Sequence, residues 1–189
     1  LKFIMKYNKL LMLFILLVFT SSSLSASKNL VNQLKKGGNI VMIRHAYAPG
    51  SGDPNGFLIQ DCSTQRNLSK QGITQAKTIG SFFKENKIPI SIVISSEWCR
   101  CKDTAFYAFR EFETNSFLNS FYDVRYQNDK DKQIIALKNY IEKWKGEKNL
   151  ILVTHYVVIK ELLNATANSG EIIIADLKFN VIGKLENKL

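Results

Sequence analysis

Short apolar runs alternate with amphipathic segments along most of this chain, and that alternation constrains its fold more than any other feature. Buried strands are predicted at 39–43, 90–94 and 149–153, with two closing strands at 171–177 and 179–185. Apolar residues at helical spacing predict helices at 69–87, 100–111, 130–145 and 157–163. The pattern indicates an α/β fold, a three-layer sandwich with a mostly parallel central sheet and helices on both faces. We expect its first two strands to be neighbours in the sheet.

The N-terminal segment has the order of a secretory signal peptide. Three lysines precede an apolar run at 10–20, and small polar residues follow it, so cleavage is expected near Ser25 or Ala26. The run is shorter than the roughly 20 residues that a membrane-spanning helix needs. We therefore predict a signal peptide at 1–26, a single domain at 27–189, and no stable membrane span after cleavage. An uncleaved N-terminal anchor is the alternative.

The charge of the chain narrows the choice of partners. The 189 residues carry a formal net charge of +10, and a basic surface can meet nucleic acid, anionic lipid or phosphorylated ligands. Its lysines are scattered rather than clustered, apart from Lys35 and Lys36. Because scattered charge is typical of a solvated surface, no nucleic-acid partner is predicted.

The only two histidines of the chain, His45 and His155, each stand just beyond the end of a predicted strand. Ligands of such sheets bind beyond the carboxyl ends of the strands, so we expect both imidazoles in one pocket. Arg44 precedes the first histidine, and Arg100 follows the second predicted strand. Arginine binds phosphate oxygens through its planar fork, a neutral imidazole is a nucleophile, and a second, protonated histidine would add donors. This set predicts phosphoryl transfer without a metal or other cofactor.

These motifs together resemble the histidine phosphatase superfamily, the phosphoglycerate mutase-like proteins. The matching segments are Arg44-His45-Ala46, Arg100 within SSEWCRCKDTA, His155 within LILVTH, and Asn67-Leu68-Ser69 at the start of the first long helix. The resemblance implies that His45 becomes phosphorylated, while Arg44, Arg100 and His155 hold the phosphoryl oxygens. The segments APGSGDP, DCSTQRNLS and WCRC are similar to an exported bacterial branch that includes the lipopolysaccharide core heptose phosphatase. That likeness implies a periplasmic location.

The chain departs from the family pattern at its proton donor. Ala46 replaces the usual glycine, and the two positions where relatives carry an acid read Ser120 and Tyr156 here. Asp53, Glu97 and Asp123 are the candidate donors, although surface or capping roles are commoner for such carboxylates. Asp53, in a glycine-rich loop after the nucleophile, is the first choice.

Arg66 and Asn67 are predicted to bind substrate, because the loop before the first helix reaches the pocket in the family. A structural ion pair is an equal alternative for Arg66.

The three cysteines favour a disulfide over a metal site. Cys99 and Cys101 form a Cys-x-Cys pair, which lacks the spacing of structural zinc sites, so no metal is predicted. An exported chain favours oxidised thiols, and a disulfide from Cys62 to Cys99 or Cys101 is expected, with one cysteine left over.

Two functions remain open at this point. The first is an exported, metal-independent phosphatase that hydrolyses a phosphomonoester, on a phosphorylated small molecule or phospho-sugar, through phospho-His45. The alternative is a phosphate- or phospho-sugar-binding protein of the same fold with little catalytic activity. Neither the natural substrate nor the oligomeric state follows from the sequence.

Overall fold

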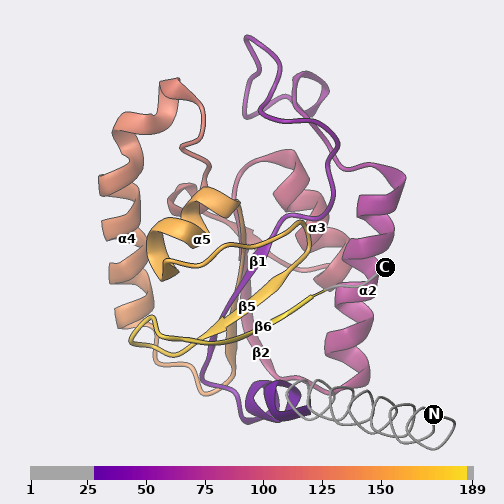
Figure 1. Ribbon diagram of the computed structural model, residues 1–189, viewed down its shortest axis with the longest axis vertical. Coiled ribbons are helices and arrows are strands. Elements are labelled where there is room, and N and C mark those ends of the chain that lie inside the picture. Colours follow the sequence, from indigo (N-terminus) through magenta and orange to yellow (C-terminus); the bar gives the residue numbers. More distant parts are fainter. Residues whose placement is uncertain (1–27, 187–189) are drawn as a thin grey trace, which may run out of the picture.

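A six-stranded sheet in the order β3-β2-β4-β1-β5-β6 forms the centre of the computed structural model, which describes residues 28–186 (Figure 1). Three pairs are parallel: β1 with β4, β4 with β2, and β2 with β3. The other two pairs, β5 with β1 and β6 with β5, are antiparallel. The strands are β1 (Ile40–Arg44), β2 (Ile90–Ser95), β3 (Glu113–Thr114), β4 (Asn149–Thr154), β5 (Ile172–Ala175) and β6 (Val181–Leu185). The predicted α/β fold with a mostly parallel sheet is confirmed. The predicted signal peptide at 1–26 lies outside the described residues.

The expected adjacency of the first two strands is wrong, because β4 lies between β1 and β2. All six residues of β4 are buried, whereas the first half of β2 is partly exposed. A parallel strand that is apolar on both faces belongs in the middle of a sheet that is covered on both sides. The placement of β4 brings the segments after β1 and β4 side by side.

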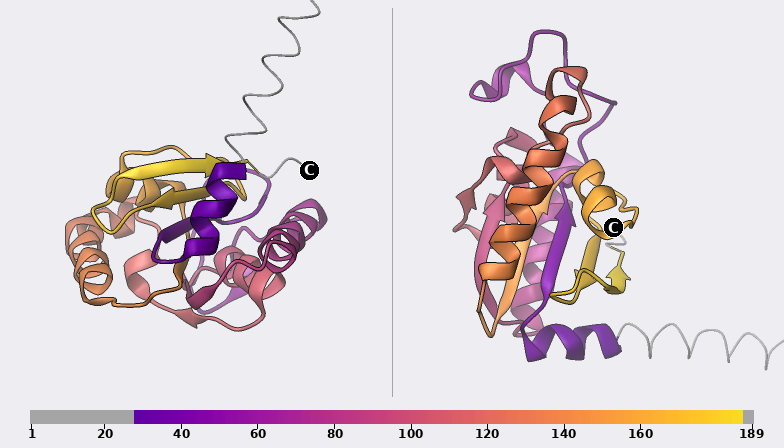
Figure 2. Two further views of the ribbon diagram at one scale, coloured as in Figure 1. Left: turned by 90° about the horizontal axis from the view of Figure 1, so that it is seen from below. Right: turned by 90° about the vertical axis from the view of Figure 1, so that its left-hand side faces the viewer.

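Helices cover both faces of the sheet, as the two further views show (Figure 2). The long helices are α2 (Lys70–Glu85), α3 (Cys99–Phe109), α4 (Lys130–Lys143) and α5 (Tyr156–Leu163), and residues 28–36 are helical as well. Short 3-10 helices lie at η1 (Cys62–Thr64), η2 (Ser116–Leu118) and η3 (Val124–Asp129). Within residues 28–186, no helix has the length and apolar character that crossing a membrane requires.

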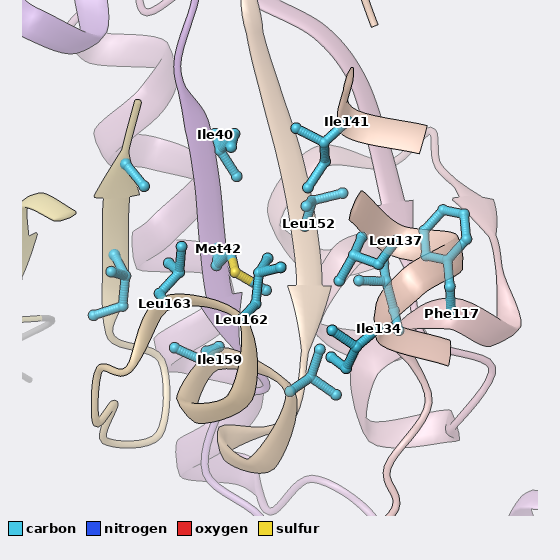
Figure 3. Close-up of a cluster of buried hydrophobic side chains, with 14 of the residues drawn as sticks. Ile40, Met42, Phe117, Ile134, Leu137, Ile141, Leu152, Ile159, Leu162 and Leu163 are labelled. Atoms are coloured by element: carbon cyan, nitrogen blue, oxygen red, sulfur yellow. The ribbon is translucent and has the colours of Figure 1, made fainter. Parts of the chain in front are cut away.

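Alternate residues of each strand point to opposite layers, which builds two separate hydrophobic clusters. Ile40 and Met42 of β1 join the cluster under α4 and α5, where Leu137 and Ile159 are fully buried (Figure 3). Val41 of β1 joins the other cluster, under α2, α3 and the helix at 28–36. Because both faces are buried, the central strands have no exposed side, and a slip of one residue would move each side chain into the other cluster.

The first long helix begins where the sequence predicts it. Ser69 is the N-cap of α2, and its hydroxyl accepts a hydrogen bond from the Gly72 backbone N–H at 3.1 Å. A side chain on Gly72 would meet the carbonyl oxygen of Tyr47, so the glycine permits the helix to lie against the loop after β1. The start of α2 thereby fixes the path of that loop.

The closing strands are shorter than predicted because a turn interrupts them. One carboxylate oxygen of Asp176 accepts hydrogen bonds from the backbone N–H groups of Lys178 and Asn180, each at 2.8 Å. Such local bonds compete with strand pairing, so β5 ends at Ala175 and β6 begins at Val181. The helix at 28–36 and the two-residue strand β3 were not predicted.

The loops that follow the carboxyl ends of β1, β2 and β4 gather at one end of the molecule. The segment between β1 and α2 is the longest of them and projects beyond the body of the molecule at the top of Figure 1. In a parallel sheet this end is the usual place for a ligand site.

Candidate active site

The two histidines lie side by side because β1 and β4 are adjacent and in register. Arg44 pairs with Thr154 at the ends of these strands, and the backbone N–H of His45 donates to the Thr154 carbonyl oxygen at 2.9 Å. The ring centroids of His45 and His155 are 5.5 Å apart, and both residues are buried. The prediction that both imidazoles share one pocket therefore agrees with the geometry.

The ring of His45 is held in one tautomer. Its Nδ1 lies 2.8 Å from the Ala46 carbonyl oxygen, which can only accept, so Nδ1 carries the proton and Nε2 keeps its lone pair. Burial, together with the nearby Arg100 cation, holds the pKa of His45 well below its ordinary value of 6.5. A neutral imidazole whose Nε2 keeps its lone pair has the electronic form of a nucleophile.

The ring of His155 differs from the sequence expectation of a protonated second histidine. Burial lowers the pKa of His155 well below 6.5, and the Arg100 cation lowers it further, so the ring is neutral at neutral pH. Its Nε2 lies 3.0 Å from Ser96 Oγ and 3.4 Å from Cys101 Sγ. Burial also raises the pKa of the Cys101 thiol to about 12, so Cys101 stays a thiol rather than a thiolate. The positive charge of the site therefore comes from arginine.

Two arginines bring buried N–H donors to the same cavity. Arg44 donates through Nη1 to the Ala167 carbonyl oxygen at 2.8 Å, and its guanidinium lies over the Tyr156 ring, 5.4 Å from the centroid. The Nε atoms of Arg44 and Arg100 are buried, and neither has a hydrogen-bond partner within residues 28–186. Buried donors without acceptors are rare in proteins, and they are expected where an anion binds.

A cavity of about 240 Å³ opens between these groups. Its walls come from the ends of β1 and β4, the start of α3 and the loops before α2 and η3. The lining residues that matter for the chemistry are Arg44, His45, Asp53, Arg66, Arg100 and His155. The rim adds Tyr122, Asp123 and Tyr156. The four residues predicted to handle the phosphoryl group thus surround one cavity.

Asp53 lies in this cavity, but it is tied to Arg100. Its two carboxylate oxygens accept hydrogen bonds from Nη1 and Nη2 of Arg100 at 2.8 and 3.1 Å, and both side chains are buried. The same oxygens also accept from the backbone N–H of Arg66 at 3.0 Å and from Trp98 Nε1 at 3.1 Å. Both carboxylate oxygens are thus taken up by N–H donors, while the buried Nε of Arg100 has no acceptor within residues 28–186.

Arg66 and Asn67 are adjacent in sequence, but only Arg66 lines the cavity. Arg66 lines the cavity, yet it donates through Nε to the Gly52 carbonyl oxygen at 2.7 Å and through Nη1 to the Ala48 carbonyl oxygen at 2.5 Å. Its cation therefore braces the glycine-rich loop, and since Arg66 is also part of the cavity wall, substrate binding by this residue stays a prediction. Asn67 does not line the cavity; its side chain donates to the Cys62 carbonyl oxygen at 2.6 Å.

The other two candidate donors are differently placed. Glu97 accepts a hydrogen bond from Asn119 Nδ2 at 2.6 Å and is not part of the cavity wall. Asp123 stands at the rim, where it caps η3 and pairs with Arg125 at 3.0 Å. Hydrogen bonds from Arg125 lower the pKa of Asp123, so its carboxyl is ionised at neutral pH.

A disulfide joins Cys62 to Cys99, with the two Cα atoms 5.6 Å apart. It links the short helix η1 to the start of α3, one residue before Arg100. Cys101, the other partner considered from the sequence, is buried and free. Within the described part of the chain, no group of three His, Cys, Asp or Glu side chains is arranged to hold a metal ion.

Sequence reasoning missed two aromatic residues of the site. Trp98 contacts Asp53 and packs against His155 with a centroid separation of 5.4 Å, and its position next to Cys99 and Arg100 was the available signal. Tyr122 lies at the rim, 6.1 Å from Tyr156 between ring centroids. Nothing in the local sequence marks it as a site residue.

Comparisons with known proteins identify the fold. No protein-family model and no curated protein sequence matches the chain. The solved structure of the protein histidine phosphatase SixA with tungstate superposes with a TM-score of 0.57 at 15% identity, covering 79% of this chain and 97% of that one. This is the phosphoglycerate mutase-like fold. It is shared with phosphoglycerate mutase from Thermus thermophilus, with a TM-score of 0.55 at 17% identity, covering 78% of this chain and 98% of that chain.

A third structure with this fold is a mutant phosphoserine phosphatase from Entamoeba histolytica in complex with phosphoserine. Its TM-score is 0.57 at 16% identity, with 79% of this chain and 98% of that chain covered. At such identities the likeness shows the phosphoglycerate mutase-like fold alone, and the chemistry has to be argued from the residues of the site.

Proposed function

We propose that the protein is a phosphatase that hydrolyses phosphomonoesters through a phosphohistidine on His45. One observation carries the proposal: Nε2 of His45 keeps its lone pair beside a cavity lined by Arg44 and Arg100, and the buried Nε–H groups of these arginines have no acceptor within residues 28–186. A phosphoryl group supplies the acceptors that these donors need and the electrophile that Nε2 needs. The solved structures with the same fold include histidine phosphatases, which supports the proposal.

The side chains around the cavity can stabilise the negative charge that the phosphoryl oxygens carry during the proposed reaction. Arg44 and Arg100 bind the oxygens of the phosphoryl group, and His155, whose Nε2 is engaged by Ser96 and Cys101, offers its other ring nitrogen. Because Nδ1 of His45 stays protonated, the phosphorylated ring is cationic and leaves as a neutral imidazole when water attacks phosphorus. Positioning and electrostatic stabilisation are the main requirements of phosphoryl transfer, so the proposed reaction needs no metal.

The proposal extends to processing, location and ligand. Residues 1–26 act as a signal peptide, residues 27–189 form one domain, and the protein is exported, in the manner of the branch that includes the lipopolysaccharide core heptose phosphatase. The disulfide between Cys62 and Cys99 supports an oxidising location such as the periplasm. The substrate is a phosphorylated small molecule or phospho-sugar, and nucleic acid is not a partner.

Hydrolysis of 4-nitrophenyl phosphate in the presence of EDTA tests the proposal. We expect turnover by the wild type, none by His45→Ala, and acid-labile phosphate on His45 in enzyme quenched during turnover. Thermal unfolding of His45→Ala checks that the variant is folded. Phosphate binding without turnover in the wild type would instead support the alternative, a binding protein of this fold.

A further inference from the structure

Among residues 28–186, both carboxylates that line the cavity, Asp53 and Asp123, are engaged in ion pairs with arginine. Asp53 is the only carboxylate deep in the cavity among residues 28–186, and both of its oxygens are committed to donors, two of them on Arg100. An acid that delivers a proton must be protonated and within hydrogen-bond reach of the departing atom. Both Asp53 oxygens already accept hydrogen bonds from Arg100, the Arg66 backbone and Trp98, so this carboxyl has no free edge to turn towards a leaving group.

The other titratable groups of the cavity wall do not supply a general acid either. Asp123 at the rim is ionised and paired with Arg125. His155 is neutral, and its Nε2 is engaged by Ser96 and Cys101, whose thiol is buried. The other hydroxyl groups in the wall belong to serine and tyrosine side chains, which are far weaker acids than a carboxylic acid.

The rim of the cavity offers a surface for a flat ring. Tyr122 and Tyr156 are 50% and 41% exposed, and their ring centroids lie 6.1 Å apart at the cavity mouth. Exposed tyrosine rings pair with other planar rings in offset or edge-to-face arrangements. A substrate with its phosphoryl group between Arg44 and Arg100 would direct the rest of its structure towards these two rings.

We propose, building on the proposed function, that the natural substrate carries its phosphoryl group on an aromatic ring whose departure needs no proton from the protein. The ring is either a phenol, phosphorylated on oxygen, or an imidazole, phosphorylated on nitrogen. The shared chemistry is a planar leaving group that is stable once it has taken the bonding electron pair. A plain alcohol would leave as an alkoxide, which is strongly disfavoured without a general acid.

The step balances without a further reactant. His45 Nε2 forms the bond to phosphorus while the bond from phosphorus to the leaving atom breaks, and that atom takes the electron pair. A phenol departs as phenolate, and an imidazole protonated on its other nitrogen departs as a neutral ring. Water then forms a bond to phosphorus, the electron pair of the N–P bond returns to Nε2, and dihydrogen phosphate is released.

The test measures kcat/KM of the oxidised wild-type enzyme on phosphoimidazole, 4-nitrophenyl phosphate, phenyl phosphate and glucose 6-phosphate. This ratio reports on transfer to His45, so slow hydrolysis of the phosphoenzyme does not obscure it. We expect the ring substrates to exceed glucose 6-phosphate by at least ~10²-fold, the lower end of what a positioned acid contributes. The two ring types distinguish an N-phosphorylated from an O-phosphorylated substrate.

Equal efficiency on all four compounds, with phosphate trapped on His45, would overturn this inference and leave the proposed function intact. Absence of phospho-His45 with every compound would overturn both. The Tyr156→Phe variant keeps the ring and removes the hydroxyl, and we expect it to retain the wild-type preference. A loss confined to glucose 6-phosphate in that variant would identify a tyrosine donor and contradict the inference.

Discussion

Replacing Asp53 by Asn removes a negative charge from the centre of the site without changing the size of the side chain. The amide keeps one oxygen, while its NH₂ group takes the place of the oxygen that accepts from Arg100 Nη2 and Trp98 Nε1, both at 3.1 Å. Each buried donor left without an acceptor costs roughly 1–3 kcal/mol, and more when it is charged. We therefore expect Asp53→Asn to lower the free energy of unfolding by about 3 kcal/mol, the lower end of the cost of breaking a buried ion pair.

Thermal unfolding of the oxidised protein measures this change. For a chain of this size, about 3 kcal/mol corresponds to a decrease in Tm of roughly 6–12 °C. Asp123→Asn is the matched control, because it also removes an aspartate from the cavity wall but from an exposed pair with Arg125. That variant should unfold close to the wild-type temperature. An Asp53→Asn protein as stable as the wild type would refute the assignment of a buried ion pair to Asp53.

Activity of the same variant separates positioning from proton donation. If Asp53 positions Arg100, kcat/KM should fall by the same factor, ~10–10²-fold, on 4-nitrophenyl phosphate and on glucose 6-phosphate, because both need the arginine. A proton donor would give a different pattern, since only the alkyl substrate depends on it. Loss on glucose 6-phosphate alone would show that Asp53 is the general acid after all.

Three further predictions concern stability. Reduction of the Cys62–Cys99 disulfide, which spans 37 residues, should lower the free energy of unfolding by about 4 kcal/mol, and equal urea midpoints with and without dithiothreitol would contradict this. Because burial lowers the pKa of His45 and His155 in the folded protein, the unfolded chain takes up protons first below about pH 6.5. Stability should be constant above that pH and decline below it, and a urea midpoint unchanged between about pH 7.5 and about pH 5 would be evidence against neutral rings. Gly72→Ala should lose roughly 1–3 kcal/mol, measured by urea unfolding, because its Cβ meets the backbone carbonyl of the loop after β1; a neutral substitution would show that this loop yields.

The parts of the fold and site that follow from strand-end positions could be predicted from sequence. His45 and His155 lie at the same edge because parallel strands end there, and they are neighbours because β4 pairs with β1. The strand order depends on non-local contacts: β4 lies between β1 and β2 because it is buried on both faces, and one of these faces is covered by α2 and α3, which lie well before β4 in the chain.

Loop carboxylates and cysteines could be predicted less well, because their partners depend on the path of the chain. The sequence predicts Asp53 as the first-choice acid, but it gives no path for the loop, so neither the ion pair with Arg100 nor the bonds from Arg66 to two loop carbonyls could be predicted. Cys99 and Cys101 are two residues apart, and the position at which α3 begins decides which of them points to Cys62.

The pairing of β1 with β4 also determines when this site can exist during folding. Asn39 and Asn149, just before β1 and at the start of β4, are bonded side chain to side chain at 2.7 Å although they are 110 residues apart in the chain. Contacts over such a separation form late, because the entropy of closing the intervening loop is lost before they stabilise anything. A nascent chain that has not yet completed β4 therefore has His45 without the cavity around it, and under the proposed function phosphate binding would report on the pairing of β1 with β4.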